Sequence, residues 1–284
     1  MPLHIAQIGS SFAAGPGIPP VADSRAMRSG ANFASLVRQR LEAEGDSGAR
    51  LTDLSVSGAT LLQLVSERQD GRFAPQIDLL PADADVVLAL GGGNDIGYIG
   101  GLFEDTLAAA PWPARLLARL LFGAGAPRKN APLAVDALAA RYGAILDAAH
   151  ARAPGARVLV VEYVTMLGPD VRPAGSGSGE EADVAFGADR VAHHRAVAAQ
   201  LLQATAMAAD APERRAWCAR VEVDGPSRAH GVGSAEPWVN GFSWGLFWAG
   251  GAFHPNAEGM KAVSELVYRK LVEMGLVVGK KPGE

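Results

Sequence analysis

Four short stretches of the chain carry the residue types that acyl-transfer chemistry needs. They supply the hydroxyls of Ser10 and Ser11, glycine amides such as that of Gly58, the amide side chain of Asn94 and the imidazole of His254, one kind of group at each of four positions. A serine becomes a useful nucleophile when an imidazole takes its proton, and the oxyanion that then forms needs preorganised N–H donors. The four positions therefore predict acyl transfer, provided that the fold brings them together.

Short apolar runs and longer amphipathic stretches alternate along the chain and indicate the elements that position these residues. Apolar runs predict strands over 3–8, 51–56, 85–90, 157–163 and 220–224. Helical periodicity, with Pro or Asn near the starts, predicts helices over 32–44, 132–153, 185–209 and 256–274. Strands that alternate with helices predict an α/β fold, here a three-layer α/β/α sandwich around a five-stranded parallel sheet of the flavodoxin-like type.

The four stretches are placed at one edge of that predicted sheet. GSS (9–11), SVSG (55–58) and GGGND (91–95) follow the first three strands, and FHPN (253–256) precedes the last helix. Ligands of open parallel sheets bind outside the carboxyl ends of the strands. We therefore expect Ser11, Gly58, Asn94 and His254 to meet there.

Composition and organisation narrow the class of protein. The chain has 284 residues, a hydrophobic share of 49% and a net charge of −4, which favour a globular protein and argue against nucleic acid as a partner. No linker or repeat divides residues 1–284, so we expect a single domain. An insertion at about 101–130 carries an apolar stripe, which is either a helix on the core or a cap over an apolar substrate pocket; the stripe comprises Leu116, Leu117, Leu120, Leu121 and Phe122.

The single Cys218 excludes an internal disulfide and a cysteine-based metal site within one subunit. The apolar stretches are shorter than the roughly 20 residues that span a bilayer, so no membrane span is expected. No secretory signal opens the chain, and we expect a cytoplasmic location; a secreted form whose leader has been removed stays open.

The four stretches resemble, in order and spacing, the four sequence blocks of the SGNH hydrolase (GDSL esterase/lipase) superfamily. PWVNG (237–241) is also similar to the region before the catalytic histidine in actinobacterial and fungal members. The resemblance runs from Gly9 to Met260, nearly the whole chain. It implies a three-layer α/β/α fold, no metal, no cofactor, and hydrolysis of small-molecule esters through a covalent acyl-enzyme.

The resemblance also implies a role for each matching residue. Ser11 matches the nucleophile, and its backbone N–H matches the first oxyanion donor. The N–H of Gly58 and the side chain of Asn94 match the second and third donors. His254 matches the general base.

Two positions depart from the family's pattern. Ser10 replaces the usual Asp before the nucleophile, which we expect to have a modest effect because that Asp carries no proton. Gly251 replaces the usual Asp three residues before the histidine. Three explanations stay open: a backbone carbonyl, most simply that of Gly251, orients His254; a carboxylate from elsewhere does so; or the protein is weakly active or inactive. The candidate carboxylates are Asp224, Glu236 and Glu258.

A second serine motif and a group of tryptophans precede His254. GFSWG (241–245) matches the G-x-S-x-G nucleophile elbow, but no apolar strand precedes it and the histidine follows too soon, so Ser243 is interpreted as a loop residue. The aromatic group predicts apolar walls of the substrate pocket and comprises Trp238, Trp244 and Trp248.

These observations together predict a metal-independent serine esterase of apolar acyl esters. The natural substrate, the acyl chain length and the oligomeric state are not determined by the sequence. Two alternatives stay open. One is a carbohydrate or acetyl-group deacetylase that uses the same residues, and the other is a non-catalytic binding module that keeps the fold.

Overall fold

The centre of the protein is a parallel sheet of five strands. The computed structural model describes residues 2–113, 115–116, 133–176 and 181–278. The strands are β1 His4–Gly9, β4 Arg50–Asp53, β5 Val86–Leu90, β6 Arg157–Val161 and β7 Cys218–Val221. Their spatial order is β4-β1-β5-β6-β7, which is the flavodoxin-like order. The predicted sheet is therefore confirmed.

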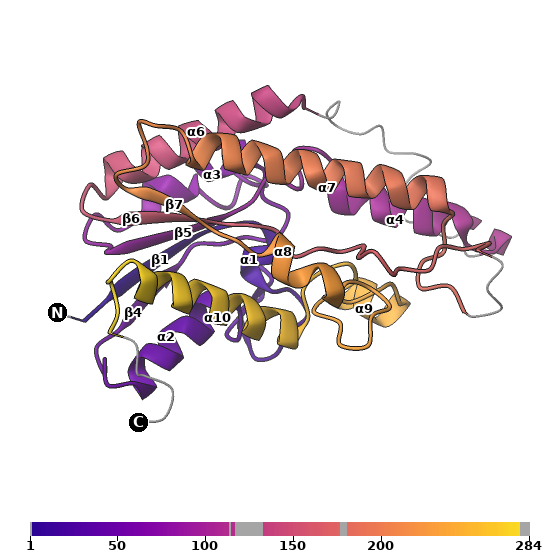
Figure 1. Ribbon diagram of the computed structural model, residues 1–284, viewed down its shortest axis with the longest axis horizontal. Helices are drawn as coiled ribbons and strands as arrows, with labels where there is room; N and C mark the ends of the chain where they lie inside the picture. The colour runs from indigo at the N-terminus through magenta and orange to yellow at the C-terminus, as the bar shows by residue number, and fades with distance from the viewer. Residues whose placement is uncertain (1, 114, 117–132, 177–180, 279–284) are drawn as a thin grey trace.

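Helices cover both faces of the sheet (Figure 1). One face carries α3 Leu61–Val65, α6 Val135–Arg152 and α7 Ala188–Ala209, and α4 Tyr98–Ala109 packs against α7. The other face carries α2 Phe33–Ala43 and α10 Ala257–Glu273. The result is the expected three-layer α/β/α sandwich.

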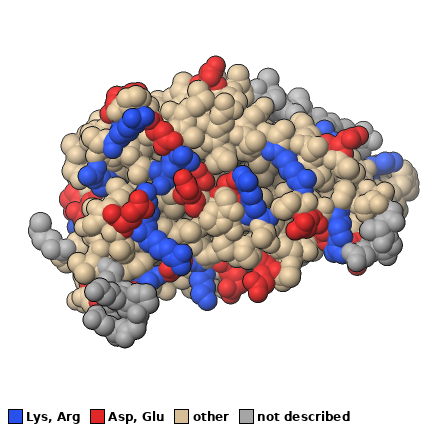
Figure 2. All heavy atoms as spheres, in the orientation of Figure 1, with Lys and Arg blue, Asp and Glu red and all other residues tan. Residues whose placement is uncertain are grey.

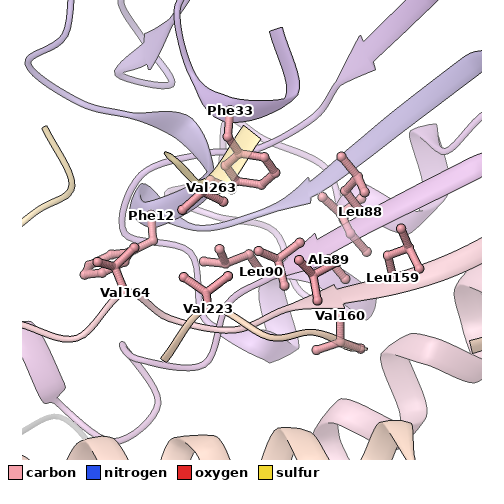
Figure 3. Packing of buried hydrophobic residues seen from close by; sticks show 14 of the residues in the cluster. Phe12, Phe33, Leu88, Ala89, Leu90, Leu159, Val160, Val164, Val223 and Val263 are labelled. Atoms are coloured by element: carbon pink, nitrogen blue, oxygen red, sulfur yellow. The ribbon is translucent and has the colours of Figure 1, made fainter. Parts of the chain in front are cut away.

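The core explains why the central strands are almost wholly apolar. All five residues of β5 are buried, because helices exclude water from both faces of a parallel sheet. Figure 3 shows Leu88 of β5 near Leu159 of β6, with Phe33 of α2 and Val263 of α10 packed from the helical layer. Full burial of each such side chain contributes roughly 1.5–3 kcal/mol.

Capping residues set the starts of two helices. The side chain of Asn32 accepts the N–H of Ser35 at 3.0 Å, and the side chain of Asn256 accepts the N–H of Gly259 at 2.8 Å. Such caps satisfy N–H groups that have no partner within the helix. Both helices begin one residue after the cap, which is one residue later than the predicted ranges 32–44 and 256–274.

Several short elements were not predicted. They include the hairpin of β2 Val21–Asp23 and β3 Arg28–Ser29, and the helix α9 Trp244–Ala249. Elements of this length show too few turns or alternations for a period to be recognised. In the predicted insertion, α4 continues to Ala109 and Leu116 is exposed, whereas Leu117, Leu120, Leu121 and Phe122 lie outside the described residues.

The charge of the surface and the length of the helices are the two features that concern contact with a membrane. Basic and acidic side chains are interspersed over the face drawn in Figure 2. In the described ranges, no helix combines the length and the apolar character that crossing a bilayer requires.

Candidate active site

The turn after β1 places Ser11 at the carboxyl edge of the sheet. A side chain on Gly9 would begin 2.3 Å from the carbonyl oxygen of Leu90, so only glycine fits between β1 and β5 there. The N–H of Ser10 donates to the same carbonyl at 2.9 Å. Ser11 then opens the four-residue helix α1 Ser11–Ala14, where its own N–H has no partner within the helix. The serine therefore presents both a hydroxyl and a backbone donor.

His254 meets Ser11 across 243 residues of sequence. Its Nε2 atom lies 2.8 Å from Ser11 Oγ, and each residue is only 8% exposed. The segment before it, the PWVNG stretch, holds the histidine loop in place. The N–H of Asn240 donates to the carbonyl of His254 at 2.9 Å, and the N–H of Asn256 donates to the carbonyl of Trp238 at 2.9 Å.

The other ring nitrogen of His254 contacts a backbone carbonyl. Nδ1 lies 2.7 Å from the carbonyl oxygen of Ala252. A carbonyl can only accept, so Nδ1 carries the proton and Nε2 is free to accept the proton of Ser11. The expectation that Gly251 supplies this carbonyl is wrong: its oxygen accepts Asn240 Nδ2 at 3.0 Å. The left-handed conformation of Phe253, with φ of 53°, turns the chain so that the Ala252 carbonyl faces the ring.

The carboxylates proposed as alternatives are engaged elsewhere or exposed. Asp224 pairs with Arg228 at 2.8 Å, and Glu258 is exposed at the start of α10. Glu236 contributes its backbone carbonyl, not its carboxylate, to a 2.7 Å contact with His230 Nδ1. Among the described residues, the ring of His254 bonds only to Ser11 and Ala252.

Burial determines the charge state of this histidine. It lowers the pKa of His254 to about 4, because an imidazolium loses its hydration there, and the Ala252 carbonyl opposes this shift only in part. The ring is therefore neutral at neutral pH and able to act as a base.

The predicted oxyanion donors lie in neighbouring turns. Gly58 has φ of 83°, a conformation that favours glycine, and it presents its backbone at the surface. Asn94 Nδ2 donates to the carbonyl of Ala59 at 2.9 Å, which ties the turn after β5 to the turn that contains Gly58. An amide NH₂ has two hydrogens, so this bond orients Asn94 and leaves one N–H for a ligand.

Tyr163 joins the nucleophile turn to the turn of Asn94, and sequence reasoning missed it. Its hydroxyl accepts the N–H of Gly93 at 3.0 Å and lies 3.3 Å from Ser10 Oγ. Burial raises the pKa of Tyr163 to about 12, so the hydroxyl keeps its proton. Its place at the carboxyl end of the predicted strand 157–163 was the available signal, because that end faces the ligand edge.

Comparison with known proteins identifies the family. The model of the GDSL-like lipase/acylhydrolase family matches residues 8–262. The chain belongs to this family. A comparison of the sequence with curated proteins finds no significant match.

Solved structures of other lipase/acylhydrolase-like proteins share the fold. An extracellular lipase from Streptomyces rimosus is 21% identical, with a TM-score of 0.63 over 94% of this chain and 98% of its own. Phospholipase A1 from Streptomyces albidoflavus NA297 is 16% identical, with a TM-score of 0.64 over 95% of this chain and 99% of its own. A family 2 carbohydrate esterase from Corynascus thermopiles (Myceliophthora fergusii) is 16% identical, with a TM-score of 0.54 over 96% of this chain and 67% of its own.

Aromatic rings pack beside the histidine of this lipase/acylhydrolase. Phe103 of α4 lies 5.3 Å from Phe253 and 6.3 Å from Phe242 between ring centroids. Phe103 was not predicted as a site residue, because α4 lies far from the His254 motif in sequence. Phe253 is buried and Phe103 and Phe242 are partly buried, so the three rings form an aromatic cluster that includes the residue before His254.

The three tryptophans differ in their surroundings. Trp238 stacks on His230 with 4.2 Å between ring centroids. Trp244 and Trp248 lie on α9 and are 38% and 64% exposed. Their predicted place in the pocket wall stays a prediction, and Ser243 caps α9 by accepting the N–H of Leu246 at 3.2 Å.

A cavity of about 340 Å³ lies at the carboxyl end of β6. Tyr163 lines it together with Tyr98, and apolar residues of α7, such as Leu201 and Leu202, complete much of the wall. Neither Ser11 nor His254 lines this cavity. It therefore lies beside the pair of Ser11 and His254, and Tyr163, which contacts Ser10 and Phe12, lies in its wall.

Proposed function

We propose that this protein is a serine esterase that hydrolyses carboxylic esters through an acyl-enzyme on Ser11. The 2.8 Å contact between Ser11 Oγ and His254 Nε2 carries the proposal, because a serine nucleophile needs a base within hydrogen-bond reach. Membership of the lipase/acylhydrolase family supports ester hydrolysis as the reaction class.

In the first half-reaction, Ser11 Oγ bonds to the ester carbonyl carbon while its proton moves to His254 Nε2. The N–H groups of Ser11 and Gly58 and the free N–H of Asn94 Nδ2 bind the oxyanion. The bond to the leaving alcohol then breaks, and that oxygen takes the proton from Nε2. Water next adds to the acyl-enzyme, gives a proton to Nε2, and releases the carboxylic acid and the Ser11 hydroxyl.

Apolar acyl groups are the substrate class that we favour. The partly buried rings of Phe103 and Phe242 pack on Phe253, the residue before His254, and make this part of the site apolar. Two of the similar structures are named as a lipase and a phospholipase A1, and a third as a carbohydrate esterase. Acetylated carbohydrate is therefore the alternative, and rates on acetyl, butyryl and octanoyl esters distinguish the two.

Replacement of the nucleophile tests the proposal. Ser11→Ala should abolish hydrolysis of p-nitrophenyl butyrate. Ser243→Ala changes the serine of the GFSWG stretch, which matches the G-x-S-x-G pattern, and should retain this activity. A fluorophosphonate probe should label Ser11 in the wild type. Substantial activity in Ser11→Ala would overturn the proposed nucleophile, and a folded wild type that neither reacts with the probe nor hydrolyses esters would favour a binding module.

A further inference from the structure

Two arginines line a surface hollow close to the turn that contains Gly58. The hollow has a volume of about 500 Å³ and is lined by Arg25, Arg72 and Phe73. A second hollow of about 380 Å³ shares Arg72 and Phe73, and its further charged residues are Arg28 and Arg68 with the carboxylates of Asp23 and Asp53. Because they share two residues, the hollows adjoin and form one basic recess.

Hydrogen bonds to the backbone of Ser57 connect this recess to the turn of Gly58. The carbonyl of Ala26, next to Arg25, accepts the N–H of Ser57 at 3.0 Å. The side chain of Gln69 donates to the carbonyl of Ser57 at 2.8 Å. The carbonyl of Gln69 in turn accepts the N–H of Arg72 at 3.0 Å. The turns that carry Arg25 and Arg72 are therefore both hydrogen-bonded to Ser57, the residue before Gly58.

Arg25 and Arg72 lack the acidic partners that most described arginines have. Arg25 and Arg72 form no ion pair with a carboxylate of the described residues. Arg28, by contrast, lies 3.6 Å from Asp53. Asp23, which also lines the recess, accepts the backbone N–H of Arg25 at 2.9 Å.

The remaining acids of the region do not neutralise the two guanidinium groups. Glu67 and Asp70 lie in the segment between α3 and Arg72, yet neither lines the 500 Å³ hollow or pairs with an arginine there. Exposed guanidinium groups without acidic partners are available to a ligand anion, and their planar donors match phosphate oxygens.

We propose that Arg25 and Arg72 bind a phosphate group of the substrate, so that the preferred substrates are carboxyl esters that carry a phosphate. The inference rests on the proposed esterase function and specifies its substrate. The ester carbonyl is held at Gly58 and Asn94 while the phosphate occupies the recess behind Ser57. The arginines act in binding and take no part in the chemical step.

Two soluble substrates that differ only in the phosphate test this specificity: 1-butyrylglycerol and 1-butyrylglycerol 3-phosphate. The wild type should favour the phosphorylated ester in kcat/KM. Arg25→Ala and Arg72→Ala should each lower kcat/KM for that ester about tenfold, through KM, because each removes charge-assisted bonds to phosphate. Neither variant should change hydrolysis of 1-butyrylglycerol by more than about twofold.

Matched controls separate a phosphate site from general charge. Arg215→Ala removes an exposed arginine near the amino end of β7 whose side chain, among the described residues, bonds the Asp210 carbonyl alone, and it should leave both rates unchanged. Arg72→Lys should restore part of the preference, because it keeps the charge and loses the fork of donors. Equal losses on both esters, or the same effect in Arg215→Ala, would overturn the proposal. A preference seen only with phosphate-bearing lipid in vesicles, and not with the soluble ester, would also overturn it in favour of surface adsorption.

Binding to an inactive enzyme separates this inference from the esterase proposal. Ser11→Ala should bind 1-butyrylglycerol 3-phosphate in calorimetry, and the further change of Arg25 and Arg72 to Ala should weaken that binding at least tenfold. Hydrolysis of neutral esters without this binding would remove the phosphate site and leave the esterase proposal intact. Binding without any hydrolysis would support the phosphate site and remove the esterase proposal.

Discussion

The Nδ1 atom of His254 lies 2.7 Å from the carbonyl oxygen of Ala252, where the family's pattern provides the carboxylate of an Asp at position 251. The carbonyl holds the tautomer that leaves Nε2 free to accept a proton. It has no net charge, so it stabilises an imidazolium less than a carboxylate does. The ring of His254 is therefore oriented toward Ser11, but its protonated form gains little electrostatic stabilisation from this partner.

Restoring a carboxylate at position 251 should increase activity. A side chain at Gly251 would begin 3.4 Å from the carbonyl oxygen of Pro16 and 3.6 Å from Asn240 Nδ2, which are ordinary contacts. Gly251→Asp should raise the pKa of His254 by about one unit or more, since an opposite charge nearby favours the imidazolium. We expect kcat/KM for p-nitrophenyl butyrate at pH 7 to increase severalfold.

The uncharged variant Gly251→Asn is the matched control for that change. It fills the same space, so it should leave the histidine pKa, followed by NMR, close to that of the wild type. Equal activities of the Asp and Asn variants would show that charge at this position does not support catalysis.

The dependence of activity on pH should reveal the buried histidine. Burial lowers the pKa of His254 to about 4, and only the neutral ring can accept the proton of Ser11. Therefore kcat/KM should stay nearly constant from pH 8 to about pH 5 and decline as the pH falls through about 4. A pH-stat assay measures this profile, and an inflection near the ordinary histidine pKa of about 6.5 would contradict it.

Removal of the side-chain oxyanion donor should affect the chemical step. Asn94→Ala should lower kcat by about 100- to 1,000-fold with little change in KM, because the donor acts mainly on the charge of the transition state. The only hydrogen bond that the Asn94 side chain forms with the described residues is the 2.9 Å bond to Ala59, so thermal unfolding should show a folded variant. A loss that appears only in KM would contradict an oxyanion role.

The hydroxyl of Tyr163 should support the site by holding the backbone of Gly93 in position. Tyr163→Phe keeps the ring that packs on Phe12 but removes the acceptor of the Gly93 N–H. We expect a loss of about 1–3 kcal/mol in the free energy of unfolding, measured with urea, because the buried N–H loses its partner. We also expect a lower kcat, because Gly93 precedes Asn94; an unchanged kcat would show that the turn keeps its shape without this bond.

The core elements were predictable because their signals are local. Apolar runs such as VVLAL of β5 predicted buried strands, and the predicted helical ranges 32–44 and 256–274 agree with α2 and α10 to within one residue at each end. The hairpin of β2 and β3 and the helix α9 were missed because each is too short to show a period. Tyr163 and Phe103 were missed as site residues because they lie in other elements and reach the site through tertiary contacts, Tyr163 by its hydroxyl and Phe103 by packing on Phe253.

Residue types and strand ends selected the four stretches, and their resemblance to the family's four sequence blocks selected Ser11, Gly58, Asn94 and His254 within them. The partner of His254 Nδ1 was decided by tertiary structure. A carbonyl is present in every residue, and which one faces the ring depends on backbone angles such as the φ of 53° at Phe253. Those angles are set by long-range bonds, including the one from Asn240 to Gly251, which no residue pattern along the chain specifies.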